Sequence, residues 1–196
     1  HVAHEPVVAG HVDETDDAAV AVRRVGPPAA GSSGHPQRAA QAIGGKVFAP
    51  EVAGLERLAA SLEGGHGATL GRAHFDPGGA STGVYREARN LPAPVDLTPG
   101  IRFWDQRFRI AVRPGTHSLS VRPWGAEIAE SWPKEERPAW LGNMPSPARA
   151  GLPVIALNGR YYLPADEASG VEPEKIGVSV RFQPTMPLSG SGFSVA

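Results

Sequence analysis

The stretch GIRFWDQRFRIAVRP, residues 100–114, decides the fold class because its apolar residues recur at every second position. Asp105 and Gln106 separate two β-rich arms, which predicts a hairpin with its turn at these two residues. A second hairpin is predicted at VIALNGRYYLP, residues 154–164, where Asn158 and Gly159 suit a type I′ turn. Antiparallel β-structure therefore dominates this half of the chain.

Further segments show the same two-residue period on both sides of these hairpins. ATLGRAHFD and GVYRE predict another hairpin across a PGG turn, Leu119 and Val121 mark a strand, and GVSVRF at residues 177–182 predicts the last one. The N-terminal half differs, because PQRAAQAIGG and PEVAGLERLAASLEGG have helical spacing and end in glycines. The predicted fold class is α+β, a short helical hairpin followed by an antiparallel β-rich sheet or barrel-like region.

Three regions follow from these elements. Residues 1–35 end in a Gly-, Pro- and Ser-rich run and are expected to be a flexible lead-in. Residues 36–66 are expected to form a helical connector, and residues 67–196 a β-rich C-terminal region. No apolar run approaches the length of a membrane span, so we expect no membrane partner and a cytoplasmic location.

The composition excludes several classes of site. The chain has no cysteine, which removes disulfides, thiolate metal sites and cysteine nucleophiles together. His1, His4 and His11 lie in the lead-in, where nothing would hold them in the geometry that a metal requires. No G-x-S-x-G segment, phosphate-binding loop or assignable carboxylate pair is present, so the sequence predicts neither a catalytic residue nor a metal or cofactor site.

The charge pattern indicates more about function than the missing motifs do. Residues 72–122 contain eight arginines and four acids, a local balance of +4 in a chain whose net charge is −1. By strand alternation, Phe108, Ile110 and Val112 point to one side of the second arm, and the arginines point away from the core with Trp104. This basic stripe consists of Arg102, Arg107, Arg109, Arg113 and Arg122. A slip of one residue in register would turn half of it inward.

Two interpretations of the stripe stay open on composition alone. Guanidinium groups bind phosphate with two parallel hydrogen bonds, and a basic face with an aromatic residue suits an RNA backbone. The alternative is that these arginines are ordinary solvent-facing residues of a protein that has only three lysines.

An ordered series of segments resembles the C-terminal half of bacterial tRNA(Ile)-lysidine synthetases. The segments are RAAQAIGGKVFAPEVAGLERLAASL (38–62), ATLGR (68–72), VYREARNLP (84–92), WDQRFRI (104–110), MPSPARAGLPVIALNGRYYLP (144–164) and VRFQPTMPLSGSGFSVA (180–196). Full-length members of that family use ATP, Mg²⁺ and lysine to convert the wobble cytidine of a tRNA(Ile) precursor to lysidine. Their adenylating domain carries an S-G-G-x-D-S loop, which this sequence lacks.

The resemblance implies a tRNA-binding C-terminal region that lacks its N-terminal ATP-pyrophosphatase domain. The implied partners are the tRNA(Ile) precursor and that missing catalytic domain, and the family is an ATP-dependent carbon–nitrogen ligase although this chain alone has no catalytic loop. Arg86 and Arg89 of VYREARNLP join Arg102, Arg107, Arg109, Arg113 and Arg122 as candidate tRNA contacts. The alternative hypothesis is an independent, non-enzymatic interaction or structural protein that kept the family's C-terminal fold. Whether the chain forms a homodimer is left open.

Overall fold

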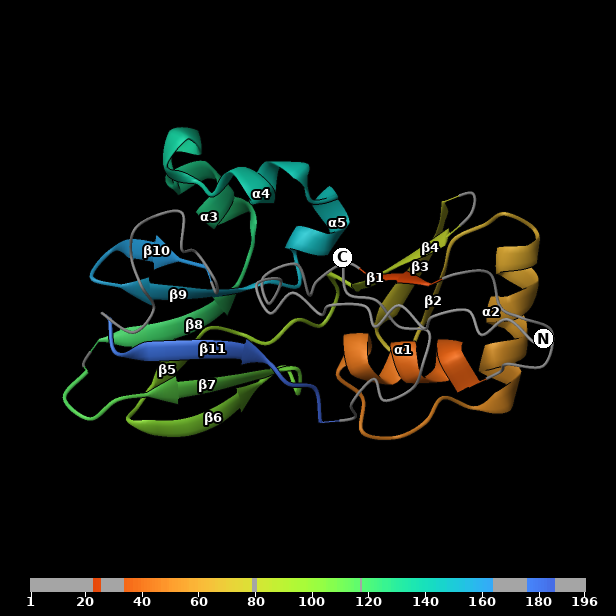
Figure 1. Cartoon of the computed structure of the whole chain (residues 1–196), viewed down its shortest axis with the longest axis horizontal. Coiled ribbons are helices and arrows are strands. Elements are labelled where there is room, and N and C mark those ends of the chain that lie inside the picture. Colours follow the sequence, from red (N-terminus) through yellow and green to blue (C-terminus); the bar gives the residue numbers. More distant parts are fainter. Residues whose placement is uncertain (1–22, 26–33, 79–80, 117, 164–175, 186–196) are drawn as a thin grey trace, which may run out of the picture.

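Two lobes lie side by side along the longest axis of the molecule (Figure 1). The computed structural model describes residues 23–25, 34–78, 81–116, 118–163 and 176–185. One lobe contains the helices α1 and α2 with strands β1 to β4, and the other contains strands β5 to β11 with three short α-helices and a 3-10 helix. The candidate site and the contacts that position it belong to the second lobe and to the junction between the two.

The first lobe is a four-stranded antiparallel sheet that two helices cover. Its elements are β1 (Arg23–Val25), α1 (Gly34–Gly44), α2 (Val52–Glu63), β2 (Ala68–Leu70), β3 (Ala73–Gly78) and β4 (Ser81–Arg86), with strand order β1-β4-β3-β2. Helical spacing brings Leu58 into the core and leaves Leu62 half-buried beside it, against Phe75 and Val84 of the sheet.

The second lobe is built from two antiparallel sheets packed face to face. One sheet has the order β10-β9-β8-β5, and the other has the order β11-β7-β6. The strands are β5 (Val95–Leu97), β6 (Gly100–Trp104), β7 (Phe108–Val112), β8 (Leu119–Pro123), β9 (Pro153–Leu157), β10 (Arg160–Tyr162) and β11 (Val178–Phe182). Alternate residues of both sheets meet in one apolar core around Ile110, Val121 and Ile155.

Short helices cover the other side of the four-stranded sheet (Figure 1). They are α3 (Ala126–Ser131), a 3-10 helix (Lys134–Glu136), α4 (Ala139–Asn143) and α5 (Ser146–Arg149). Trp124, Trp132 and Leu141 are buried in this layer with Val154 of β9. Among the described residues no helix covers the outward side of the three-stranded sheet, where Ile101 and Phe103 of β6 are exposed.

The α+β fold class is confirmed, and each sheet in the described part of the chain is open and antiparallel. The predicted strands near residues 119 and 177–182 are present as β8 and β11, and the Asn158–Gly159 turn joins β9 to β10 with positive φ at both residues. No helix among the described residues combines the length and the apolar character needed to cross a bilayer.

The regional boundaries differ from those expected. Residues 23–25, expected in a flexible lead-in, form β1 and pair with β4, whereas residues 1–22 and 26–33 lie outside the described residues. The two helices share their core with β3 and β4, so the packing unit extends across residue 66. The helices between residues 126 and 149 had no counterpart in the sequence-based expectation, because each is too short to show a sustained helical period.

Candidate nucleic-acid interface

The turn between β6 and β7 sets which side chains share a face. Asp105 and Gln106 have φ values of 52° and 58°, and the amide of Arg107 donates to the carbonyl of Trp104 at 3.1 Å. This is the predicted turn, but Trp104 pairs with Phe108, so Arg107 is an extra residue in the connection. The strand pair is therefore one residue out of the register that a two-residue loop would give.

That single residue reverses the predicted face of β6. Trp104 was expected beside the arginines, but it is only 3% exposed and faces the core with Phe108. Phe103 lies opposite Arg109 instead and is 42% exposed. A shift of one residue exchanges the two faces of a strand because side chains alternate with a period of two.

β11 completes the outward face of the three-stranded sheet. Arg181 is the register partner of Arg109, so Phe103, Arg109 and Arg181 form one row across three strands. A second row has Ile101 at its β6 end. We call this surface the open face, and it consists of Ile101, Phe103, Arg109, Ala111, Ser179 and Arg181.

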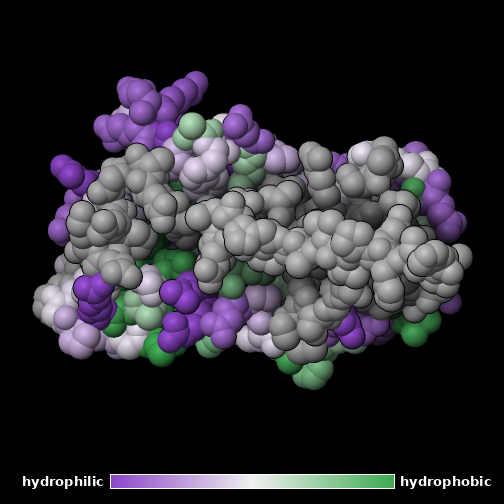
Figure 2. Space-filling view, in the orientation of Figure 1, coloured by the Kyte–Doolittle hydropathy of each residue, from purple (hydrophilic) through white to green (hydrophobic). Residues whose placement is uncertain are grey.

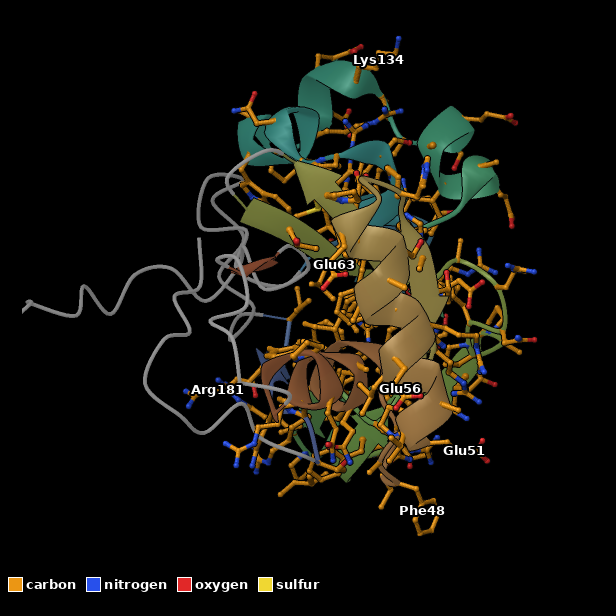
Figure 3. The ribbon with its side chains drawn as sticks, turned by 90° about the vertical axis from the view of Figure 1, so that its right-hand side faces the viewer. Phe48, Glu51, Glu56, Glu63, Lys134 and Arg181 are labelled. Atoms are coloured by element: carbon orange, nitrogen blue, oxygen red, sulfur yellow. The ribbon has the colours of Figure 1, made fainter. Side chains whose placement is uncertain are left out.

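The open face combines cations with exposed apolar groups. Ile101 is 62% exposed, Arg181 is exposed and Arg109 is half-buried. Over β11, β7 and β6, Figure 2 shows strongly hydrophilic residues beside hydrophobic ones, and in Figure 3 the Arg181 side chain points away from the ribbon. Phe103 belongs to none of the apolar clusters and contacts no other aromatic ring among the described residues.

The charge of this sheet is unbalanced. Strands β6, β7 and β11 contain three arginines and no aspartate or glutamate. Arg109 and Arg181 are direct cross-strand partners, and within the described residues neither guanidinium has a hydrogen bond or an ion pair. Like charges directly opposite each other destabilise a sheet, so an anion bound between them would relieve the repulsion.

Two of the predicted tRNA contacts are not on the surface at all. Arg86 and Arg107 are 1% and 0% exposed, and the carboxylate of Asp105 lies between their guanidinium groups. Arg86 donates Nε to Oδ2 at 2.9 Å and Nη2 to Oδ1 at 3.1 Å, while Arg107 donates Nε to Oδ2 at 2.8 Å. Neither side chain can reach a phosphate outside the molecule, so assigning them to tRNA contact is wrong for this structure.

Their role is to hold the junction of the two lobes together. Arg86 at the end of β4 also donates to the carbonyls of Glu87 at 2.8 Å and Asn90 at 3.0 Å, which fixes the loop that leaves the first lobe. Arg107 donates Nη2 to the carbonyl of Gly151 at 2.6 Å, between α5 and β9. We call Arg86, Asp105 and Arg107 the junction cluster.

The electrostatics of the junction cluster follow from its burial. Two cations face one carboxylate, and Nη1 of Arg107 has no hydrogen-bond partner among the described residues. Burial lowers the pKa of Arg107 to about 10, with Arg86 acting in the same direction and Asp105 opposing the shift. The guanidinium of Arg107 also lies 4.9 Å from the ring centre of Phe108, which gives it a cation–π contact.

The other five candidates do not form one stripe. Arg89 is exposed in the loop after β4, where it donates to Glu87 at 2.7 Å, and Arg102 donates to the carbonyl of Asp96 at 3.1 Å from the core-facing side of β6. Arg122 lies on the other sheet, 3.6 Å from Glu127 of α3. Arg113 is exposed directly after β7. Only Arg109 of the seven lies on the open face itself.

Sequence reasoning did not select Arg181, although it identified the strand that carries it. Val178, Val180 and Phe182 face the core by alternation, which leaves Ser179 and Arg181 on the outward side. The sequence did not indicate that β11 pairs with β7, because the two strands lie about 70 residues apart along the chain. No feature of the sequence indicated that Phe103 is exposed either, because aromatic residues in β-patterned segments are usually packed in the core.

The described residues provide no group of three or more His, Asp or Glu side chains that could hold a metal ion, and His1, His4 and His11 lie outside them. The comparisons with known proteins give no assignment: no family model, no curated protein and no solved structure matches this chain.

Proposed function

We propose that this chain is the tRNA-binding C-terminal portion of a tRNA(Ile)-lysidine synthase and that the open face contacts the RNA. The observation that carries the proposal is the in-register pair of Arg109 and Arg181, two cations on a sheet whose strands contain no carboxylate. Each guanidinium can bind a phosphate with two parallel hydrogen bonds, and a phosphate near both would relieve their repulsion.

The resemblance to the family supplies the identity of the RNA. Three of its segments meet at the junction cluster, since VYREARNLP contributes Arg86, WDQRFRI contributes Asp105 and Arg107, and the carbonyl of Gly151 lies in the segment 144–164. The positions that carry the resemblance therefore include those that join the lobes. Catalysis is left to an N-terminal domain that would bind ATP, Mg²⁺ and lysine.

Helix α2 of the first lobe is a poor surface for RNA. Glu51, Glu56 and Glu63 follow the exposed side of α2, with Arg57 as the one exposed cation in that helix (Figure 3). An acidic helix face repels phosphate, so the proposal places no RNA contact on α2.

Titration of an unmodified tRNA(Ile) transcript with the full chain tests this proposal. Fluorescence anisotropy across about 50 to 200 mM salt should show affinity that falls steeply as salt rises. Replacing Arg109 and Arg181 together by glutamine should weaken binding and reduce the slope of log K against log salt by roughly 1.4 to 1.8, the contribution of two phosphate contacts. No detectable binding at the lowest salt would refute the proposal.

A matched control distinguishes binding at the open face from a general effect of lost positive charge. Arg57→Gln combined with Arg160→Gln removes the same charge from exposed positions on α2 and β10. We expect this double variant to bind tRNA nearly as well as the unchanged chain. Equal losses in the two double variants would contradict an RNA contact at the open face.

An independent interaction protein is the second candidate. The exposed apolar side chains of Ile101 and Phe103 on the edge strand β6 favour it, because an edge strand can pair with another chain. Under that hypothesis the chain would self-associate or bind a protein, and adding tRNA would not change its sedimentation. Sedimentation of the chain with and without tRNA distinguishes the two.

A further inference from the structure

We propose that the open face binds unpaired nucleotides, with a base stacked on Phe103 and the flanking phosphates held by Arg109 and Arg181. This inference rests on the proposed RNA-binding function and names the form of RNA that the surface takes. Single-stranded segments, ends, loops and bulges present free base faces, whereas the bases of a duplex are already stacked on each other.

The position of Phe103 carries the first step. The residue is 42% exposed on an edge strand, and it packs into none of the apolar clusters. By contrast, its neighbours Trp104 and Phe108 are 3% and 4% exposed in the core, and the lobe's remaining strand aromatics, Tyr161, Tyr162 and Phe182, each pack against an apolar cluster. Phe103 therefore contributes little to the fold and offers a flat apolar surface to solvent.

The row in which Phe103 lies carries the second step. Neighbouring strands in a sheet lie about 4.8 Å apart, so the row from Phe103 through Arg109 to Arg181 spans roughly 10 Å. A base on the ring would thus have its own backbone over the two arginines. Aromatic stacking together with cationic backbone contacts is the arrangement by which sheet surfaces bind single-stranded nucleic acid.

The size and charge of the surface decide between a nucleotide and a protein partner. Its exposed apolar part consists chiefly of Ile101 and Phe103, far less than the roughly 800 Å² that each partner buries in a stable protein interface. Two unpaired cations beside that small apolar area would also need carboxylates from a protein partner. A phosphodiester chain with a base matches both the small apolar area and the two cations within one nucleotide or two.

Three RNA probes test the inference with the full chain. They are a short single strand, a blunt duplex, and the same duplex with an unpaired 3′ extension that contains 2-aminopurine. Phe103→Ala should weaken binding of the single strand and of the extended duplex by about 5- to 150-fold, the usual effect of removing one stacked aromatic. Binding of the blunt duplex should change little.

Phe103→Trp provides the conservative control. It should restore binding of the extended duplex and quench the 2-aminopurine fluorescence, since an indole stacks at least as well as a phenyl ring. The salt slope should be the same for Phe103→Ala and the unchanged chain, because the ring neutralises no phosphate. Melting curves confirm that each variant is folded, which the exposure of the ring favours.

The outcomes are distinguishable. If the three probes bind equally, if Phe103→Ala alters none of them, and if Arg109→Gln with Arg181→Gln weakens all, stacking is refuted and the RNA-binding proposal stands. If no probe and no tRNA binds at low salt, both fall together. If Phe103→Ala changes only self-association of the chain, the surface is a protein contact and the inference is overturned.

Discussion

Asp105→Asn should destabilise the protein severely, because one carboxylate balances two buried cations. In the junction cluster its oxygens accept three hydrogen bonds from Arg86 and Arg107, and the Asp105 side chain itself is 2% exposed. Asparagine tolerates the φ of 52° at this position about as well as aspartate does, so the turn itself should form. The substitution therefore removes the charge without adding backbone strain.

The magnitude follows from the burial of both partners. Removing one member of a buried ion pair typically costs about 3 to 5 kcal/mol, since the remaining charge stays desolvated without a partner. Here two guanidinium groups lose their counter-charge, and the new amide group would face a donor of Arg86 or Arg107. A loss of about 3 to 5 kcal/mol corresponds to a fall in Tm of roughly 6 to 20 °C for a chain of this size.

Urea unfolding at neutral pH, followed by circular dichroism, measures this loss. Asp96→Asn is the matched control, because Asp96 is exposed on β5 and should change the free energy of unfolding by less than about 0.5 kcal/mol. Adding Arg107→Met to Asp105→Asn should recover part of the loss by removing one of the two unbalanced cations. A cost for Asp105→Asn below about 1 kcal/mol, or no larger than the control's, would refute the reasoning.

Two further predictions concern the first lobe and the helices of the second. Gly44→Ala should destabilise the protein by about 3 kcal/mol in urea unfolding, because a Cβ there would lie 1.8 Å from the carbonyl oxygen of Gly71. Gly142→Ala in α4, with no atom within 4 Å of the new Cβ, should instead be neutral or stabilise by up to about 1 kcal/mol, and similar losses in both variants would contradict the packing argument. The pKa of Tyr85 is raised to about 12, first by burial and then by its hydrogen bond to Asp76. The folded state keeps this proton longer than the unfolded chain does, so stability should fall as pH rises from about 10 to 12. In Tyr85→Phe the fall should be shallower in urea titrations at each pH, and an unchanged pH dependence would show that another group is responsible.

The arginines of this chain perform two distinct tasks in neighbouring places. Arg107 and Arg109 are two residues apart, yet one is fully buried in an ion-pair cluster and the other lies on the open face. A lysine-poor composition makes both look alike in the sequence. Mutating arginines of this segment without regard to burial would confuse loss of fold with loss of binding.

Local pattern by itself determined much of the fold. The two-residue period of residues 108–112 placed Phe108, Ile110 and Val112 in the core, and the Asn158–Gly159 pair specified the β9–β10 turn, because both depend only on neighbours along the chain. Helical spacing between glycines likewise specified α2.

Only the tertiary structure decided the faces and the partners. Arg107 became an extra residue in its turn because Asp105 and the carbonyl of Gly151 hold its guanidinium inside, and this one-residue shift turned Trp104 inward and Phe103 outward. Arg181 reached Arg109 only when β11 paired with β7. Alternation states which residues share a face, but contacts between segments far apart in the chain decide which face is covered and which meets solvent.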